Sequence, residues 1–212
     1  MLDNWLEKSK LENFVKKFVR KIFFNRISPN QMTLCGLIFG LLTALFIFLS
    51  SFPQYQLIFF ILSIIFIIIS FVFDAFDGAL ARLDKPSIFG GILDMFCDRT
   101  VEVSIIIALI STDANLLMWP GIFSLGAIIL CITMFLVVGG AVNAENLKEA
   151  QKVIYYRKGL MERSETFLFL LFIIIFIAIR WILFWLFSLF IFITAFLRLY
   201  DAYKIFNSPN LT

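Results

Sequence analysis

Long apolar stretches occupy most of this 212-residue chain, and they limit the folds open to it more than any other feature. About 20 consecutive apolar residues in a helix are enough to cross the hydrocarbon core of a bilayer. Six such stretches follow one another, near residues 32–51, 57–82, 88–110, 117–141, 165–180 and 181–200. Hydrophobic residues make up 61% of the chain, above the roughly half that is usual in soluble domains. We therefore expect an all-α integral membrane protein with six transmembrane helices.

The first 27 residues carry a different pattern. Between Trp5 and Phe23, apolar residues recur at helical spacing with Lys and Arg between them. This pattern is typical of an amphipathic helix that lies in the membrane interface, although a cap packed on the protein's own cytosolic face would show the same alternation. We divide the chain into a juxtamembrane helix over 1–27, a six-helix transmembrane domain over 28–206 and a C-terminal tail over 207–212.

The distribution of basic residues predicts how the chain is oriented. Nearly all Lys and Arg precede the first apolar stretch, lie in the second or fourth connection, or lie near the C-terminus, whereas Arg180 stands alone on the opposite side. By the positive-inside rule, both termini and these two connections face the cytoplasm. We expect a multi-pass protein of the cell membrane that contacts membrane lipids. The net charge of +3 follows from this topology and does not indicate nucleic-acid binding.

Acidic residues interrupt the apolar pattern where the second stretch meets the third. In a helix, positions at offsets 0, 3, 4, 7 and 8 share one face. Here those positions hold Asp74, Asp77, Gly78, Ala81 and Arg82. In the next stretch, a second face holds residues spaced by four, which are Gly90, Asp94 and Asp98. A short loop joins the two segments, so we expect a hairpin in which these two faces meet.

The carboxylates of this hairpin, which we call the four acids, belong to Asp74, Asp77, Asp94 and Asp98. An Asp at the centre of a transmembrane helix costs about 2.5–3.5 kcal/mol, so four would cost on the order of 10–14 kcal/mol. One nearby Arg cannot neutralise them. The chain has no His, and carboxylate oxygens suit a hard ion such as Mg²⁺ or Mn²⁺. We therefore predict a site for two divalent cations that opens to the cytoplasm.

The chemistry of such a site follows from its parts. Two metal ions, an Arg and the space left by Gly suit a phosphate or pyrophosphate ligand, and a spare carboxylate could serve as a general base. Ion pairs of helix ends at the membrane surface are the alternative, but they do not explain four acids that face one another beside small residues. The residues alone therefore predict metal-dependent phosphoryl chemistry at a membrane surface.

The segment from Asp74 to Asp98 resembles the signature of the CDP-alcohol phosphatidyltransferase family. In that signature two Asp flank two residues, and Gly, Ala-Arg, a second Gly and two further Asp follow. The matching residues here are Asp74, Asp77, Gly78, Ala81, Arg82, Gly90, Asp94 and Asp98. The stretch from Ser28 to Thr33 is similar to the start of the family's first helix. Six spans with a juxtamembrane helix also match the family's architecture.

This resemblance implies a role for each residue. Asp74, Asp77 and Asp94 would hold the metal ions, while Asp98 would act as the base and could also contact one metal. The CDP moiety would be contacted by Gly78, Ala81, Arg82, Gly90, Asn30, Thr33 and Ser87. The implied reaction of phospholipid biosynthesis transfers a phosphatidyl group from a CDP-alcohol, such as CDP-diacylglycerol, to the hydroxyl of a small polar acceptor and releases CMP. Family members are commonly homodimers, so we expect a homodimer.

The acceptor is indicated by shorter stretches. Residues 159–163 resemble inositol-phosphate-using members, and Arg99 stands where glycerol-phosphate-using members often have Lys. The acceptor could therefore be inositol phosphate or glycerol 3-phosphate. Arg157, Lys158 and Arg163 could hold an anionic acceptor, although the positive-inside rule accounts for the same charges.

Two other classes of protein fit parts of the pattern. Intramembrane acids also mark ion pathways, so a cation-coupled transporter is one alternative. The polar groups of such a pathway usually continue across the bilayer, whereas the acids here cluster at one end. A non-catalytic membrane scaffold of the same fold is the other alternative, but the complete signature does not indicate lost chemistry. Ion flux without CMP formation would favour transport.

Overall fold

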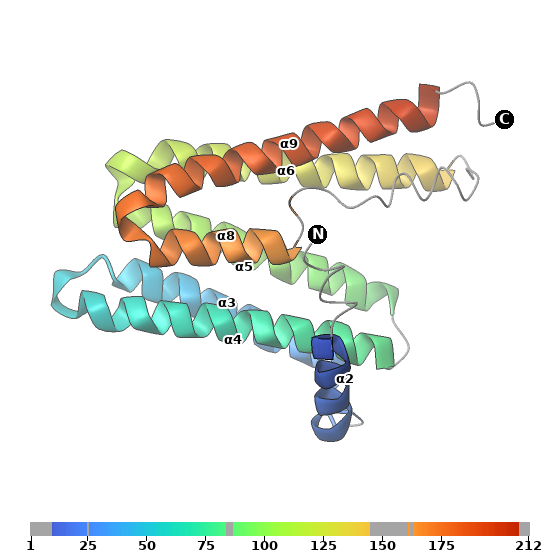
Figure 1. The fold of residues 1–212 in the computed structure, drawn as a ribbon, viewed down its shortest axis with the longest axis horizontal. Coiled ribbons are helices and arrows are strands. Elements are labelled where there is room, and N and C mark those ends of the chain that lie inside the picture. Colours follow the sequence, from blue (N-terminus) through green and yellow to red (C-terminus); the bar gives the residue numbers. More distant parts are fainter. Residues whose placement is uncertain (1–9, 25, 84–86, 145–160, 162, 208–212) are drawn as a thin grey trace.

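The computed structural model describes residues 10–24, 26–83, 87–144, 161 and 163–207, and every regular element in these ranges is helical (Figure 1). The α-helices are α2 (Lys10–Ile22), α3 (Pro29–Leu49), α4 (Gln56–Leu83), α5 (Ile88–Thr112), α6 (Ala114–Ala144), α8 (Arg163–Ile175) and α9 (Arg180–Asn207). Two 3₁₀ turns, η1 (Pro53–Tyr55) and η2 (Ile177–Ile179), precede α4 and α9. The helices from α3 onward run side by side, and α2 lies across one end of the bundle.

Within the described residues, four segments are long and apolar enough to cross a membrane: Pro29–Leu49, Pro53–Leu83, Ala114–Ala141 and Ile177–Asn207. They make the chain a multi-pass membrane protein and support four of the six predicted spans. Helix α5 carries Asp94 and Asp98 of the signature. Helix α8 has 13 residues, about 20 Å of helix, which is shorter than the hydrocarbon core. Crossing by α5 and α8 stays a prediction, as does the interfacial position of α2.

The turn between the last two helices lies earlier than the sequence pattern indicates. The predicted stretches 165–180 and 181–200 place it between Arg180 and Trp181, but α8 ends at Ile175 and α9 already begins at Arg180. Phe176, with φ −91° and ψ 71°, leaves the helical conformation. The residues here are uniformly apolar without Gly or Pro, so no local turn signal marks the break.

The start of α3 is fixed by a local hydrogen-bonded cap. Ser28 Oγ accepts a hydrogen bond from the Gln31 backbone N at 3.3 Å, and the Ser28 backbone N donates to Gln31 Oε1 at 3.0 Å. This reciprocal pair is a capping box, and Pro29 occupies the first helical position. The cap sets Asn30 and Thr33 in the first turn of α3.

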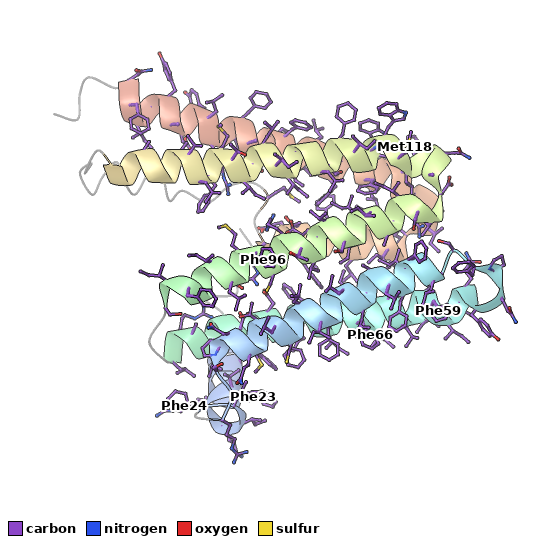
Figure 2. All side chains as sticks on the ribbon, turned by 180° about the vertical axis from the view of Figure 1, so that it is seen from behind. Phe23, Phe24, Phe59, Phe66, Phe96 and Met118 are labelled. Atoms are coloured by element: carbon purple, nitrogen blue, oxygen red, sulfur yellow. The ribbon has the colours of Figure 1, made fainter. Side chains whose placement is uncertain are left out.

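Apolar side chains fill the core and also cover the outside of the bundle. Ile106, Leu109, Ile173 and Phe184 are among the fully buried core residues. Figure 2 shows large apolar side chains along the outer faces as well, and Phe96 is 64% exposed. Because no soluble protein would leave so much apolar surface in water, this surface fits contact with lipid.

Small residues allow α3 to approach its neighbours closely. Ser70 Oγ of α4 donates a hydrogen bond to the Gly36 carbonyl oxygen at 2.8 Å. At Gly40, a Cβ atom would overlap the side chain of Val101 on α5. The two glycines therefore let α3 pack closely against α4 and α5, the helices that carry the four acids.

We expect Gly40→Ala to destabilise the fold, because an added methyl group at this contact overpacks the core by about 1–3 kcal/mol. The measurement is the midpoint of thermal unfolding in detergent. Gly126→Ala on α6 is the matched control, since a Cβ there meets nothing within 4 Å and Ala favours a helix over Gly. A Gly40→Ala midpoint equal to that of Gly126→Ala would contradict the close packing.

Candidate functional site

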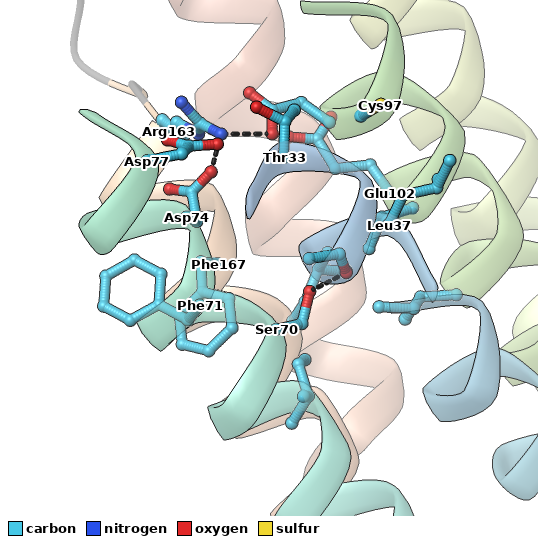
Figure 3. Close-up of a pocket in the computed structure, with 16 residues that line it drawn as sticks. Thr33, Leu37, Ser70, Phe71, Asp74, Asp77, Cys97, Glu102, Arg163 and Phe167 are labelled. Atoms are coloured by element: carbon cyan, nitrogen blue, oxygen red, sulfur yellow. Dashed lines mark hydrogen bonds and ion pairs between the residues drawn. The ribbon is translucent and has the colours of Figure 1, made fainter. Parts of the chain in front are cut away.

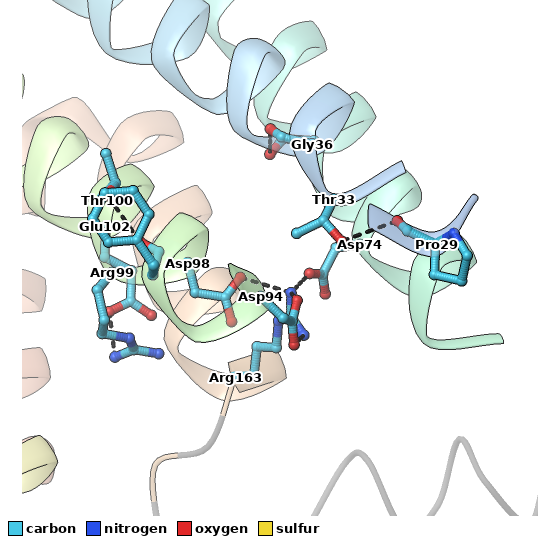
Figure 4. Close-up of polar contacts among 12 residues, drawn as sticks. Pro29, Thr33, Gly36, Asp74, Asp94, Asp98, Arg99, Thr100, Glu102 and Arg163 are labelled. Carbon is cyan, nitrogen blue, oxygen red and sulfur yellow. Dashed lines mark hydrogen bonds and ion pairs between the residues drawn. The ribbon is translucent and has the colours of Figure 1, made fainter. Parts of the chain in front are cut away.

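Three of the four acids meet between α4 and α5. One carboxylate oxygen from each of Asp74, Asp94 and Asp98 lies within 4.8 Å of the other two. Asp94 and Asp98 are one turn apart on α5, and Asp74 faces them from α4, as the expected hairpin requires (Figure 4). Oxygens that ligate one Mg²⁺ lie at most about 4.2 Å apart. Small side-chain rotations would therefore bring these oxygens into a coordination shell.

Arg163 of α8 lies against these three acids. Its Nη1 donates a hydrogen bond to Asp94 Oδ2 at 2.9 Å, and its Nη2 donates to Asp94 Oδ1 at 2.8 Å and to Asp98 Oδ1 at 2.6 Å. It also forms an ion pair with Asp74 (Figures 3 and 4). One guanidinium faces three carboxylates, so the cluster keeps a formal negative charge that further cations can balance.

Asp77, the remaining acid, is buried one turn after Asp74 on α4, with 4% of its surface exposed. Its Oδ2 has no hydrogen-bond partner among the described residues. A buried carboxylate oxygen without a partner is costly, and a divalent cation would satisfy it. The unpartnered oxygen and the all-oxygen donor set therefore fit the predicted metal site.

A small inner cavity of about 60 Å³ extends from the acids into the bundle (Figure 3). Asp74, Asp77, Asp98 and Arg163 line it together with apolar residues of α3, α4, α5 and α8. The lining also includes Glu102, a buried acid that our interpretation of the sequence missed. The available signal was the four-residue spacing of Asp94 and Asp98, which Glu102 continues for one more turn.

Arg99 compensates the charge of Glu102. The Arg99 Nη1 atom lies 2.5 Å from Glu102 Oε2 in an ion pair between residues three apart on α5. The guanidinium of Arg99 is thus directed to Glu102. The role of Arg99 in acceptor choice stays a prediction.

An outer pocket of about 380 Å³ lies beside Asp77 and Asp94. It brings together six residues that we expected to contact the CDP moiety: Asn30, Thr33, Gly78, Ala81, Ser87 and Gly90. They come from α3, α4 and the start of α5, where Ser87 Oγ accepts a hydrogen bond from the Gly90 backbone N at 2.9 Å. A pocket of this size can take a nucleotide-sized ligand.

Gly90 has a steric reason to be glycine. A Cβ there would lie 2.9 Å from Ser87 Oγ and 3.0 Å from Asn30 Oδ1. Both atoms belong to residues of the outer pocket. A larger residue at this position would therefore displace the side chain of Ser87 or Asn30 from its place in the pocket lining.

The structure separates the basic residues that we proposed for substrate binding. Arg82 is exposed on α4, and its Nη1 lies 3.7 Å from the position of a Cβ on Gly78, so it stands beside the outer pocket. Arg163 lies inside the acid cluster, a contact that the sequence did not predict. Arg157 and Lys158 lie outside the described residues.

Comparison with known proteins identifies similar sequences and structures. The family model described as CDP-alcohol phosphatidyltransferase matches residues 26–193. Two solved structures of the phosphatidylinositol phosphate synthase of Mycobacterium tuberculosis share this fold at 20% sequence identity. The structure with CDP-DAG bound has a TM-score of 0.62 and covers 94% of this chain and 96% of its own. The complex with manganese and citrate has a TM-score of 0.61, with 93% and 91% covered. No curated protein matches the chain.

Proposed function

Because the chain belongs to the CDP-alcohol phosphatidyltransferase family, we propose that it transfers a phosphatidyl group from CDP-diacylglycerol to the hydroxyl of a small polar acceptor. CMP is the second product, and the reaction belongs to phospholipid biosynthesis. One observation carries the proposal. The outer pocket is lined by the signature residues expected to contact CDP, and it opens beside the acid cluster.

Asp74, Asp77 and Asp94 would hold two divalent cations, Mg²⁺ or Mn²⁺, and Asp98 could contact one of them. When bound, such cations neutralise phosphate oxygens and stabilise the charge that develops during phosphoryl transfer. Asp77 is suited to contact both substrate and metal, since it lines the outer pocket as well as the inner cavity. The manganese complex of the M. tuberculosis synthase supports this choice of ion.

The outer pocket would bind the CDP moiety of the donor. Gly78 and Gly90 leave room for the ligand to approach the backbone, and Ser87 and Asn30 supply polar groups to the lining beside Gly90. Arg82 stands at Gly78, where its guanidinium can form two parallel hydrogen bonds to the pyrophosphate. The CDP-DAG bound by the M. tuberculosis synthase supports this donor.

Asp98 would act as the base. A carboxylate oxygen of Asp98 accepts the proton of the acceptor hydroxyl while the hydroxyl oxygen forms a bond to the phosphorus attached to the lipid alcohol. The bond from that phosphorus to the bridging oxygen breaks, and CMP leaves with the electron pair. Arg163, hydrogen-bonded to Asp98 at 2.6 Å, would hold an anionic acceptor beside this base. Inositol phosphate and glycerol 3-phosphate are the two acceptors considered.

The proposal includes an arrangement in the cell membrane. All six helices from α3 to α9 would cross it, with both termini and the active site toward the cytoplasm. The juxtamembrane helix over 1–27 would lie in the interface, the transmembrane domain would cover 28–206 with a tail over 207–212, and two copies would form a homodimer. Phe18, Lys17 and Arg20 support the position of α2, because all three are exposed on a helix that packs on α4 through Val19.

The test is a reaction of purified protein with radiolabelled CDP-diacylglycerol, Mg²⁺ or Mn²⁺, and a panel of acceptors. We expect labelled phospholipid and CMP in equal amounts with one anionic acceptor. Release of no CMP with any acceptor would contradict the proposal. Cation flux in vesicles without CMP formation would instead favour the transporter.

Substitution of each of two arginines should raise the KM for a different substrate. We expect Arg163→Lys to raise the KM for the acceptor at least about tenfold, because an ammonium group cannot reproduce forked hydrogen bonds to a phosphate. Arg82→Lys is the matched variant, and we expect it to raise the KM for the CDP-lipid by a similar factor. Steady-state kinetics with each substrate varied in turn measures both. If the two variants raise the KM for the same substrate, the assignment of separate subsites is wrong.

A further inference from the structure

A cavity of about 520 Å³ with polar and apolar lining residues opens at the end of the bundle opposite the acid cluster. Its lining residues come from the loop after α3, the start of α4, the junction of α5 with α6, and the start of α9. Figure 1 shows these elements together at one end of the bundle, and Gln56 at the start of α4 is about 27 Å along the helix from Asp74. Its polar lining consists of Ser50, Ser51, Gln56, Thr112, Asp113 and Arg180. We call it the distal cavity. Nothing in the proposed reaction uses it.

Arg180, which lines this cavity, lacks one hydrogen-bond partner among the described residues. Its Nη1 donates to Thr112 Oγ1 at 3.0 Å, which ties α9 to the end of α5. Its Nε is buried and has no hydrogen-bond partner in the described part of the chain. The hydrogen bond to Thr112 therefore satisfies only one of the N–H groups of the guanidinium and leaves Nε without an acceptor within the described ranges. A buried N–H without an acceptor is costly, and an anionic oxygen is the acceptor that an arginine fork fits best.

The net charge of the residues that line the distal cavity indicates what charge a bound anion should carry. Arg180 and Asp113 are the charged residues among those that line it. Asp113 Oδ1 accepts a hydrogen bond from the Leu116 backbone N at 3.2 Å, so this carboxylate caps α6 and stays in place. One positive and one negative charge leave the lining neutral. A phosphodiester with a single negative charge is therefore better accommodated than a free phosphate dianion.

The surroundings of the distal cavity fit a lipid. Tyr55, Trp119 and Trp181 are exposed at this end of the bundle, by 51%, 58% and 42%, and Trp and Tyr gather at the level of lipid headgroups. The apolar wall includes Leu57 and Ile177, which are 70% and 52% exposed. Polar groups beside exposed apolar side chains match a headgroup that continues into acyl chains.

We propose that the distal cavity binds the phosphodiester headgroup of a phospholipid from the leaflet opposite the active site. The phosphate oxygens accept hydrogen bonds from Arg180, and the glycerol and first acyl carbons contact Leu57 and Ile177. Such a lipid would hold the α3–α4, α5–α6 and α8–α9 connections together at one membrane surface.

The experiment measures thermal unfolding of the full chain in a maltoside detergent with excess chelator, which weakens phosphate binding at the acid cluster. The probes are didecanoyl-phosphatidylglycerol, didecanoylglycerol without phosphate, and inorganic phosphate at equal ionic strength. We expect the phosphatidylglycerol to raise the unfolding midpoint and the other two to have little effect. Equal stabilisation by didecanoylglycerol or by inorganic phosphate would overturn the proposal.

Variants connect the effect to the distal cavity. Arg180→Gln should weaken the apparent affinity for phosphatidylglycerol at least about tenfold, the loss expected for charge-assisted hydrogen bonds. Thr112→Val removes the structural hydrogen bond but should retain the lipid response. Asp113→Asn keeps Arg180 and should let inorganic phosphate stabilise the protein, a test that remains if Arg180→Gln does not fold. An unchanged affinity in Arg180→Gln, or no phosphate response in Asp113→Asn, would contradict the site.

Discussion

Removal of divalent metal is expected to abolish CMP release, and Asp94→Asn should reproduce most of that loss at saturating metal. Both carboxylate oxygens of Asp94 accept hydrogen bonds from Arg163. Asp94 also belongs to the acid cluster and lines the outer pocket. Losing several kcal/mol of charge stabilisation in the transition state lowers the rate roughly a thousandfold. The measurement is initial velocity in chelator and after titration with Mg²⁺ or Mn²⁺.

The control for this prediction is Asp201→Asn, which removes an acid of α9 outside the candidate site. We expect its activity and metal titration to match those of the parent protein. Full activity in excess chelator would show that metal is not needed. An Asp94→Asn variant with the parent's metal dependence would remove Asp94 from the set of ligands.

Asp98→Asn should lower turnover at least about a hundredfold while metal and CDP-lipid binding persist. Asn keeps the size of the side chain but does not accept a proton, and a lost general base costs roughly 10²- to 10⁴-fold. Asp74→Asn is the comparison, because it removes a carboxylate that we assign to metal binding alone. CMP release and metal-dependent thermal stabilisation should be measured for both variants in one detergent.

Asp98→Asn and Asp74→Asn should differ in metal-dependent thermal stabilisation. We expect Asp74→Asn to lose metal-dependent stabilisation along with turnover, whereas Asp98→Asn loses turnover alone. Equal loss of stabilisation would mean that Asp98 acts mainly as a ligand. Near-normal turnover of Asp98→Asn would exclude it as the base.

The residues of the outer pocket were predictable because each lies near others in the sequence. Spacings of three and four place Asp74, Asp77 and Gly78 on one face of α4, whatever the helix packs against. The short connection to α5 then turns Gly90 and Asp94 toward them. Family signature and helical periodicity thus agreed on the same side chains, and the structure gathers six of the seven expected CDP contacts around one pocket.

The sequence by itself determined the class of protein and the faces of individual helices. Apolar length predicts membrane helices, and local spacing predicts which side chains share a face. Only the tertiary structure decided that Arg163 reaches Asp94 and Asp98 and that α8 ends at Ile175. These features depend on how helices distant in the chain pack together. Such packing is set by side-chain shapes across several interfaces, and no spacing within one helix records it.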